Sequence, residues 1–443
     1  MEIPLLEYFS DPVLRAPTLG SILMCLSASL IGVLVYLKKE SLIGEAISHA
    51  AYPGVILGGL FFALFYHGTS ENPLFPLFVM TGAFLTGSIG IAVLNFLTQK
   101  LKVKSDAALC FVLSSFFGVG VFLASQMQFT HTLLYKQVQV YLWGQAATMV
   151  QAHIWIYLSL FLIILLPIAI FYKELKAILF DRTWSLSFGL PVKAIDRLLM
   201  VLIILSLVTG IRSVGVVLIT AMLIQPAVAA RQFTDNLSRM FMLAAFFGAI
   251  SAFFGNVLAL EFSYRLDLSF PTGPMIVIVS SVLALMALLF APKRGIVPRR
   301  YRQVKYQLRA FVENTLKTMW RLKGESPIPL KELATYYSHS PKTLRGVLAY
   351  LSYAGWAKKA SSNSWQLTRE GALRAQKIIR FHRLWEVYLV EWVGSPAERV
   401  HKSAEEIEHV ITKEMEEELQ ELLNHPKLDP HKQPIPPSEE DML

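Results

Sequence analysis

The sequence predicts an all-α polytopic membrane domain of about nine transmembrane helices, followed by a C-terminal winged helix-turn-helix domain and a second helical domain. Three observations support this architecture. The 443 residues are 54% hydrophobic and 16% charged, with a mean hydropathy of +0.48, whereas soluble domains carry about 25% charged residues. The basic residues are unevenly placed, since 24 of the 41 Lys and Arg residues follow position 293. Long apolar runs end near that position, which predicts a membrane half of residues 1–292.

The membrane half contains nine apolar runs, most of them close to the ~20 residues that cross a bilayer. The sixth and seventh are short and are separated only by Arg212 and Ser213, so one broken helix, and eight spans, is the alternative. The acidic N-terminus lacks the basic start and cleavage site of a signal peptide, and we expect the first run to be retained. The predicted spans are 18–37, 43–66, 75–98, 107–125, 153–172, 197–211, 214–230, 239–260 and 273–292.

The distribution of positive charge predicts the orientation. With an outer N-terminus and nine crossings, sixteen Lys and Arg residues fall in the inner connections and four fall outside. Inner connections of membrane proteins are enriched in Lys and Arg. The sequence therefore predicts that the tail lies in the cytoplasm.

Two absent motifs narrow the function. Cys25 and Cys110, the two cysteines, both lie in apolar runs, which excludes a disulfide framework and a Cys-rich zinc motif. No G-x-x-x-x-G-K-[ST] sequence occurs, so the chain lacks the phosphate loop of an ATPase. We therefore expect no enzyme activity from the chain itself.

The second span carries two ionisable side chains. Glu45 and His49 are four residues apart and would share one face of a helix. Charged groups within a span normally face a pathway or a partner, and a carboxylate with an imidazole suits Mn²⁺, Fe²⁺ or Zn²⁺. The alternative is a structural hydrogen bond between a neutral His and the Glu.

A short amphipathic segment, residues 173–191, separates the fifth and sixth spans. It contains Phe180 and Asp181 and ends in Gly189-Leu-Pro191. Such a helix could dock into a groove of a partner protein, or it could lie on the membrane surface.

These motifs, together with Val214-Gly215…Gln225-Pro226-Ala, resemble the permease of the ABC importers that take up manganese, zinc or iron. The resemblance covers about residues 15–292. It implies that Glu45 and His49 belong to the metal pathway, although Asp is more usual at the first position. It also implies that Phe180, Asp181 and Gly189 contact a separate ATP-binding subunit. An extracytoplasmic metal-binding protein and a second permease copy or paired permease complete the implied complex.

The tail divides by charge into a basic part and an acidic part. Residues 294–399 have a net charge of +13, and residues 400–443 have a net charge of −8. This pattern suggests a nucleic-acid-binding face joined to a cation-binding or dimerising helix; a solvated helical tail is the alternative. The predicted domains are 1–292 (permease), 293–308 (basic linker), 309–375 (winged helix-turn-helix) and 376–443 (helical).

The basic part has the pattern of a winged helix-turn-helix. After a helical run at 301–323, two short helices are predicted at 329–337 and 341–351, with a break at Ser338-His339-Ser340. The second would present Lys342, Thr343 and Arg345 to a DNA major groove.

The stretch 356–369 has the pattern of a two-stranded wing, with Lys358 and Lys359 placed for phosphates. A winged helix that binds protein instead of DNA is the alternative.

The acidic part and the helix before it concentrate metal-ligand types. His382 and Glu386 are four apart, and Glu405, Glu408 and His409 are predicted on one helix face. Six candidates within 28 residues, with His401 as the sixth, indicate a site for a divalent transition metal, Fe²⁺ or Mn²⁺ with Zn²⁺ as an option.

Over about residues 310–438 the tail resembles the iron- and manganese-dependent repressors of the diphtheria-toxin-repressor family. By position, that resemblance makes His382, Glu386, Glu405, Glu408 and His409 metal ligands and places His401 in an ancillary site. The family also draws ligands from its first helix. The matching positions here are Asn314 and Lys317, which are poor ligands, and Glu313 is the substitute if the register shifts. Because the sequence ends at Leu443, we expect the additional C-terminal domain of some family members to be absent.

The whole chain therefore resembles permease–repressor fusions of bacterial metal uptake. The leading hypothesis is an ATP-driven metal importer subunit whose tail represses genes by binding operator DNA. A tail that gates transport in cis without DNA, and a receptor that transports nothing, are the alternatives. The basic segment Lys293–Arg300, with Gly295 and Pro298, predicts an accessible linker whose cleavage would release a soluble fragment; an ordinary anchor at the inner membrane face is the alternative.

Overall fold

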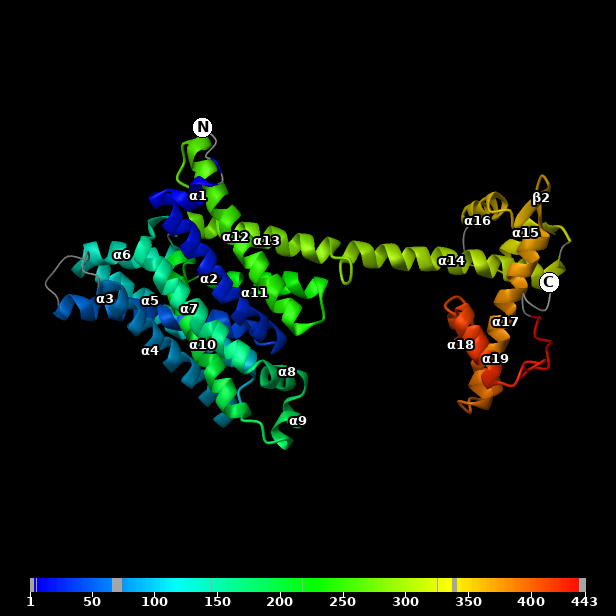
Figure 1. Cartoon of the computed structure of the whole chain (residues 1–443), viewed down its shortest axis with the longest axis horizontal. Helices are drawn as coiled ribbons and strands as arrows, with labels where there is room; N and C mark the ends of the chain where they lie inside the picture. Colours follow the sequence, from blue (N-terminus) through cyan, green and yellow to red (C-terminus); the bar gives the residue numbers. More distant parts are fainter. Residues whose placement is uncertain are drawn as a thin grey trace. The chain divides into compact units, whose positions relative to one another are not determined.

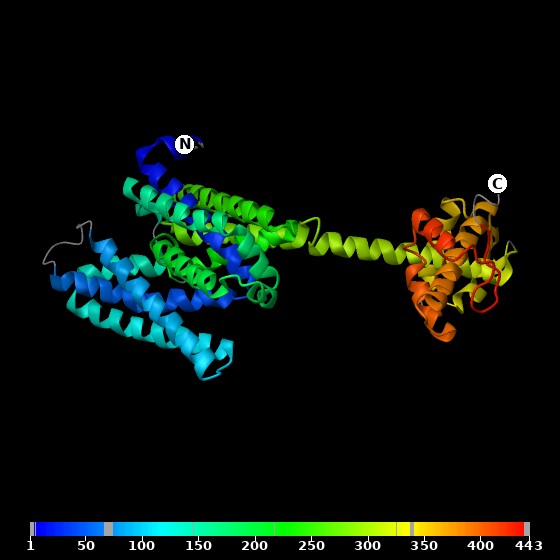
Figure 2. The ribbon, with the colours of Figure 1, turned by 60° about the horizontal axis from the view of Figure 1, so that its bottom comes forward.

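A computed structural model describes residues 4, 6–65, 74–144, 146–216, 218–324, 326–336 and 341–437. The chain separates into two compact units, Met1–Arg299 and Arg300–Leu443. The first is a bundle of helices and the second is a mixed unit with one small sheet (Figures 1 and 2).

The first unit contains, among its described residues, eight helices long and apolar enough to cross a membrane. Their outer faces expose large apolar side chains such as Phe61, Phe122 and Leu166, as expected for surfaces that contact lipid. They are α2 (Pro12–Leu37), α3 (Ser41–Phe65), α4 with its π-helical end η1 (Phe75–Asn95, Phe96–Lys100), α5 (Ser105–Thr130), α7 (Gln151–Ile170), α10 (Val192–Val214), α12 (Leu237–Leu266) and α13 (Thr272–Phe290).

The seventh predicted span, 214–230, forms a shorter helix than predicted. The structure does place a break after α10, at Gly215 with φ +96°, but the following helix α11 (Ile219–Phe233) has only 15 residues. At 1.5 Å per residue this is about 22 Å, short of the ~30 Å hydrocarbon core. It packs against α2, α12 and α13. The apolar run reflects burial within the bundle as well as contact with lipid.

Small residues allow the closest helix contacts of this unit. A Cβ added at Gly32 of α2 would lie 1.7 Å from the carbonyl oxygen of Leu223 in α11, and one at Gly54 of α3 would lie 2.1 Å from that of Gly82 in α4. The backbones thus approach without intervening side chains, as in other membrane bundles. The short helices of the unit are α1 (Glu7–Ser10), α6 (Thr132–Trp143), η2 (Ala146–Thr148), α8 (Tyr172–Phe180) and α9 (Arg182–Ser187).

The second unit begins on α14 (Ile296–Lys323). This helix includes residues 296–308, so most of the predicted linker, 293–308, is helical and only residues 293–295 of it are not. Pro298 is tolerated because it lies in the first turn, where backbone N–H groups lack helical partners. The side chains from 299 to 309 are exposed.

The winged helix-turn-helix is present. The structure contains α15 (Leu330–Ala334), α16 (Pro341–Tyr353), and a sheet of order β1-β3-β2 made of β1 (Ile328–Pro329), β2 (Ala357–Ser361) and β3 (Ser364–Leu367). The predicted break at 338–340 lies outside the described residues. Buried Leu316, Leu333, Leu348 and Leu367 belong to its core.

Three helices complete the unit: α17 (Arg369–Glu391), α18 (Ala397–Ile407) and α19 (Lys413–Leu422). α17 packs against both α18 and α19. Ile435 from the last described segment contacts a second small core that includes Leu384 and Leu423. The acidic part of the chain therefore packs against α17.

Candidate metal centres

Glu45 and His49 lie on α3, both half-buried. The His49 ring packs edge-on against Phe117 of α5, with 4.8 Å between ring centroids. Its Nδ1 atom is buried and has no hydrogen-bond partner among the described residues. A buried polar atom without a partner is costly, and a passing cation could use this lone pair.

The segment predicted to contact a partner forms two helices instead of one. Phe180, which ends α8, is 92% exposed. The Asp181 carboxylate caps α9 by accepting from the backbone N–H groups of Thr183 at 2.8 Å and Trp184 at 3.0 Å. Gly189 has φ +76°, a conformation that glycine adopts readily. The result is an exposed aromatic corner on a well-capped helix.

An ion-pair cluster that the sequence did not reveal lies beside this corner. Asp196 of α10 binds Arg182 of α9 at 2.7 Å and Lys38, which follows α2, at 3.0 Å. Lys38 also lies 3.4 Å from Glu40, next to the start of α3. Lys38 and Asp196 are 158 positions apart in the sequence, so no local spacing could have revealed this pair. The cluster links α9 to the corner between α2 and α3.

The tail brings His382, Glu386 and His401 together as a first group. Each offers a ligand atom, and these atoms lie within 4.8 Å of one another. His382 Nε2 is 2.9 Å from His401 Nδ1, and Glu386 Oε1 is 3.0 Å from His401 Nδ1 and 3.2 Å from His382 Nε2. His382 and Glu386 are buried, whereas the His401 side chain is 51% exposed. Two imidazoles and one carboxylate fit a divalent transition metal.

A second group adjoins the first through Glu408. Glu408 Oε2 accepts from His382 Nδ1 at 2.6 Å, and Oε1 contacts the Lys317 ammonium. His409 Nδ1 lies 2.8 Å from Glu313 Oε2, while its Nε2 has no hydrogen-bond partner among the described residues and lies 3.6 Å from Glu408 Oε1. All four side chains of this group, Glu313, Lys317, Glu408 and His409, are buried.

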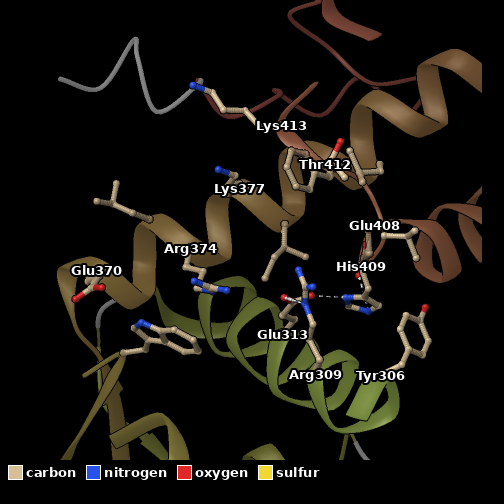
Figure 3. Close-up of a pocket in the computed structure, with 16 residues that line it drawn as sticks. Tyr306, Arg309, Glu313, Glu370, Arg374, Lys377, Glu408, His409, Thr412 and Lys413 are labelled. Atoms are coloured by element: carbon tan, nitrogen blue, oxygen red, sulfur yellow. Dashed lines mark hydrogen bonds and ion pairs between the residues drawn. The ribbon is translucent and has the colours of Figure 1, made fainter. Parts of the chain in front are cut away.

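Figure 3 shows the Glu313–His409 pair at a cavity of about 690 Å³, with Arg309 beside it. The pair joins α14 to the turn after α18. Arg309 reaches Glu313 at 2.9 Å on the outer side. A smaller cavity, about 520 Å³, adjoins the first group and is also lined by His431 and Gln433. Both groups are thus reachable from solvent-filled space.

The contacts shift the acidity of these groups. Burial alone would raise the pKa of Glu386, but hydrogen bonds from His382 and His401 outweigh it and lower that pKa to about 2. Burial also opposes the charge on Glu408, yet His382 and Lys317 lower its pKa, and His409 and Arg309 lower the pKa of Glu313 against its burial. For His382, burial is outweighed by Glu386 and Glu408, which raise its pKa. The carboxylates are therefore held ionised.

The spacing predicted that Glu405, Glu408 and His409 share one helix face; of these three side chains, Glu408 and His409 are buried and Glu405 is exposed. α18 ends at Ile407, and Glu408 begins the turn that follows. The Glu405 side chain is half exposed and lies 3.6 Å from His401 Nε2. Glu313, not Asn314, faces His409. The i to i+4 spacing of Glu313 and Lys317 on α14 was the available signal for their shared face.

The side chains predicted to meet DNA are on the surface. Lys342, Thr343 and Arg345 are exposed in the first turns of α16, and Lys358 and Lys359 are exposed on β2. A basic surface of this kind suits phosphate contacts.

Two family profiles match the chain. The ABC 3 transport family matches residues 10–291. The profile "Iron dependent repressor, metal binding and dimerisation domain" matches residues 368–437, which include His382, Glu386, His401, Glu408 and His409.

Individual relatives agree with these profiles. The chain is 32% identical over 97% of its length, and 97% of the relative's, to a "Probable metal transport system membrane protein" of Chlamydia trachomatis. It is 31% identical to the manganese transport system membrane protein MntC of Bacillus subtilis, over 84% of this chain and 82% of that one. It is 33% identical to the zinc transport system membrane protein TroC of Treponema pallidum, over 69% and 97%.

Among solved structures, PsaBC from Streptococcus pneumoniae in complex with Fab is 29% identical, with a TM-score of 0.56. The match covers 68% of this chain and 98% of that one.

Proposed function

The chain belongs to the ABC 3 transport family, and from this premise we propose that its membrane unit imports Mn²⁺ or Fe²⁺ while its tail senses the same ion and represses genes. The chain is a metal permease fused to an iron-dependent-repressor-type domain. The relatives include proteins named for manganese and for zinc, so Zn²⁺ is the competing cargo. The observation that carries the proposal is the presence of both matched regions in one chain.

We assign Glu45 and His49 to the path of the imported ion. The unpartnered Nδ1 of His49 and the nearby carboxylate on α3 would hold the substrate briefly. Glu45→Ala and His49→Ala should each abolish uptake of ⁵⁴Mn while the complex still assembles. Glu261→Ala, which removes an exposed pair with Arg265 at the end of α12, is the control. Wild-type uptake in the Glu45→Ala/His49→Ala double variant would remove the pair from the pathway.

ATP hydrolysis requires a separate subunit, because the chain has no phosphate-binding loop. The exposed corner of Phe180, Asp181 and Gly189 is the surface assigned to that subunit. Its aromatic side chains can fill a groove, and its cap fixes the orientation of α9. An extracytoplasmic metal-binding protein and a second permease subunit complete the proposed assembly. Phe180→Asp should abolish co-purification with the ATPase and leave the permease folded.

The tail is proposed to bind operator DNA when metal is bound. The first group joins α17 to α18 through His382, Glu386 and His401. Without metal, these side chains are joined by hydrogen bonds. A bound ion would join α17 and α18 more firmly through metal–ligand bonds. DNA would meet α16 and the wing.

Gel shifts with residues 294–443 test this role. Fe²⁺ or Mn²⁺ should increase operator affinity, and His382→Ala should remove the increase. Lys402→Ala, which changes an exposed residue of α18, should not. Equal binding by apo and metal-loaded tails would contradict the sensor function and favour a tail that gates the permease.

We further propose that the tail lies in the cytoplasm and that cleavage near Lys293–Arg300 releases it. The side chains of this segment are mostly exposed, but α14 starts at Ile296, so a protease must either cut at 291–295 or unwind the first turn. Immunoblots of membrane and soluble fractions with an antibody to the tail would show a soluble fragment. Full-length protein alone, all of it in the membrane, would contradict release.

A further inference from the structure

The second group of the tail already contains a cation of its own. The Lys317 side chain is 6% exposed and contacts Glu408, whose side chain is fully buried. A lysine ammonium is rarely buried in a protein unless a carboxylate pairs with it. On the outer side of the same group, Arg309 pairs with Glu313. Both carboxylates of the second group are therefore matched by fixed positive charges.

The first group differs in this respect. The side chains that approach within ligand distance of one another are two imidazoles and the Glu386 carboxylate. The Arg383 guanidinium on α17 interacts electrostatically with Glu386, but its ion pair is with Asp429 at 3.4 Å and it donates to the carbonyl oxygen of Pro434. Thus the groups in contact with Glu386 are the imidazoles of His382 and His401, and among the described residues no Lys or Arg side chain forms an ion pair with it.

We propose that each tail binds one divalent metal, at His382, Glu386 and His401, and that the Lys317 ammonium permanently occupies the cation position of the second group. A metal at the second group would have to displace an ammonium that remains charged and buried without its carboxylate. Breaking a buried pair in this way should weaken binding by about 10²- to 10⁴-fold. This inference rests on the proposed sensing function and specifies its stoichiometry.

The same geometry predicts what happens when the ammonium is removed. Glu408 Oε1, Glu313 and the unpartnered His409 Nε2 are already in place. Without Lys317 they form a set of carboxylate and imidazole donors with no compensating cation on Glu408, which suits Mn²⁺. Lys317 therefore determines whether the tail is a one-metal or a two-metal sensor.

The test counts bound metal on the full-length chain. Glu45→Ala and His49→Ala are included in every protein, so that only the tail contributes. Equilibrium dialysis against Mn²⁺ alone, with the bound metal measured by atomic emission, should give one ion per chain. Lys317→Gln should give two, Lys317→Arg should give one, and Lys402→Gln, which neutralises an exposed lysine of α18, should give one.

The outcomes separate the inference from the function on which it rests. Two tight ions in the protein with Lys317 intact would overturn the inference, and this result does not depend on any Lys317 variant folding. One ion in a folded Lys317→Gln protein, verified by circular dichroism, would also overturn it. Loss of the single ion in His409→Ala but not in His382→Ala would place the metal in the second group and refute the assignment. No bound metal in any protein would refute the sensor function itself.

Discussion

Replacing Glu408 by Ala should destabilise the metal-free tail more than any other single loss of a carboxylate in the two groups. The substitution removes the buried partner of Lys317 and the acceptor of the 2.6 Å hydrogen bond from His382. The ammonium then stays in a site where its side chain is only 6% exposed. Leaving one partner of a buried pair uncompensated costs about 3–5 kcal/mol.

That free energy corresponds to a large change in melting temperature. For a unit the size of Arg300–Leu443, each kcal/mol lowers Tm by about 3–5 °C, so Glu408→Ala should lower it by about 10–20 °C. Circular dichroism of residues 300–443 in chelator measures the change. Glu405→Ala is the matched control, because its side chain is 50% exposed and 3.6 Å from His401. An exposed pair contributes less than about 1 kcal/mol.

A double variant tests the cause of the loss. Lys317→Met combined with Glu408→Ala removes both charges, so about 2 kcal/mol or more should be recovered relative to Glu408→Ala alone. If Glu408→Ala and Glu405→Ala melt within about 3 °C of each other, the uncompensated ammonium is not the dominant effect. Strictly additive losses in the double variant would refute the reasoning in the same way.

Three other predictions follow, two for the membrane unit and one for the tail. Asp196→Asn should reduce uptake about tenfold while the complex retains ATP hydrolysis, because Arg182 and Lys38 lose their shared carboxylate. Asp235→Asn is the control, since its carboxylate is 55% exposed and pairs with Arg231 and Arg294, and it should change uptake little. Normal uptake per ATP hydrolysed in Asp196→Asn would exclude this cluster from the coupling of hydrolysis to transport. Gly32→Val should prevent assembly, because its Cβ would lie 1.7 Å from the carbonyl oxygen of Leu223. Size-exclusion chromatography would show this as loss of the monodisperse peak. Gly118→Val is the control, since Gly118 has open space around it, and it should keep the peak. The urea midpoint of the metal-free tail should be highest between about pH 4.5 and 6.5. The pKa of Glu386 is lowered to about 2, so its contribution to stability is lost as the pH falls from the pKa of the unfolded chain toward 2. The pKa of His382 is raised, so its contribution is present below about pH 6.5 and is lost as the pH rises through the pKa of the folded protein. A urea midpoint that stays constant from pH 6 to 9 would contradict the contacts assigned to His382.

The sequence predicted most helices of the membrane unit because long apolar runs leave few alternatives. The span predicted at 214–230 was too long, because the same apolar composition there serves a short helix, α11, that packs against α2, α12 and α13. It also treated Lys293–Arg300 as irregular because Gly295 and Pro298 lie there, yet Pro298 in the first turn of α14 is compatible with a helix. The presence of a Gly or Pro was therefore a weaker indicator of irregular structure than the position of that residue within the helix.

Candidate side chains could be selected by type and spacing, but their partners could not. Pairing of Lys317 with Glu408 joins residues 91 positions apart, and that of Glu313 with His409 joins residues 96 positions apart. Glu405 fits the same i to i+4 pattern as the others and still remains at the surface, where its carboxylate lies 3.6 Å from His401 Nε2. Only the folded structure distinguishes the first group, whose carboxylate contacts histidines, from the second group, whose carboxylate Glu408 is paired with Lys317.

The presence of both units in one polypeptide has a quantitative consequence for control. Translation of one message yields one Met1–Arg299 unit and one Arg300–Leu443 unit, so importer and sensor are made in equal numbers at every level of expression. A cell that increases its uptake capacity increases its capacity for repression by the same factor. With one ion bound per tail, the set point of such a feedback loop would depend on the affinity of a single site, and its gain would not drift with promoter strength.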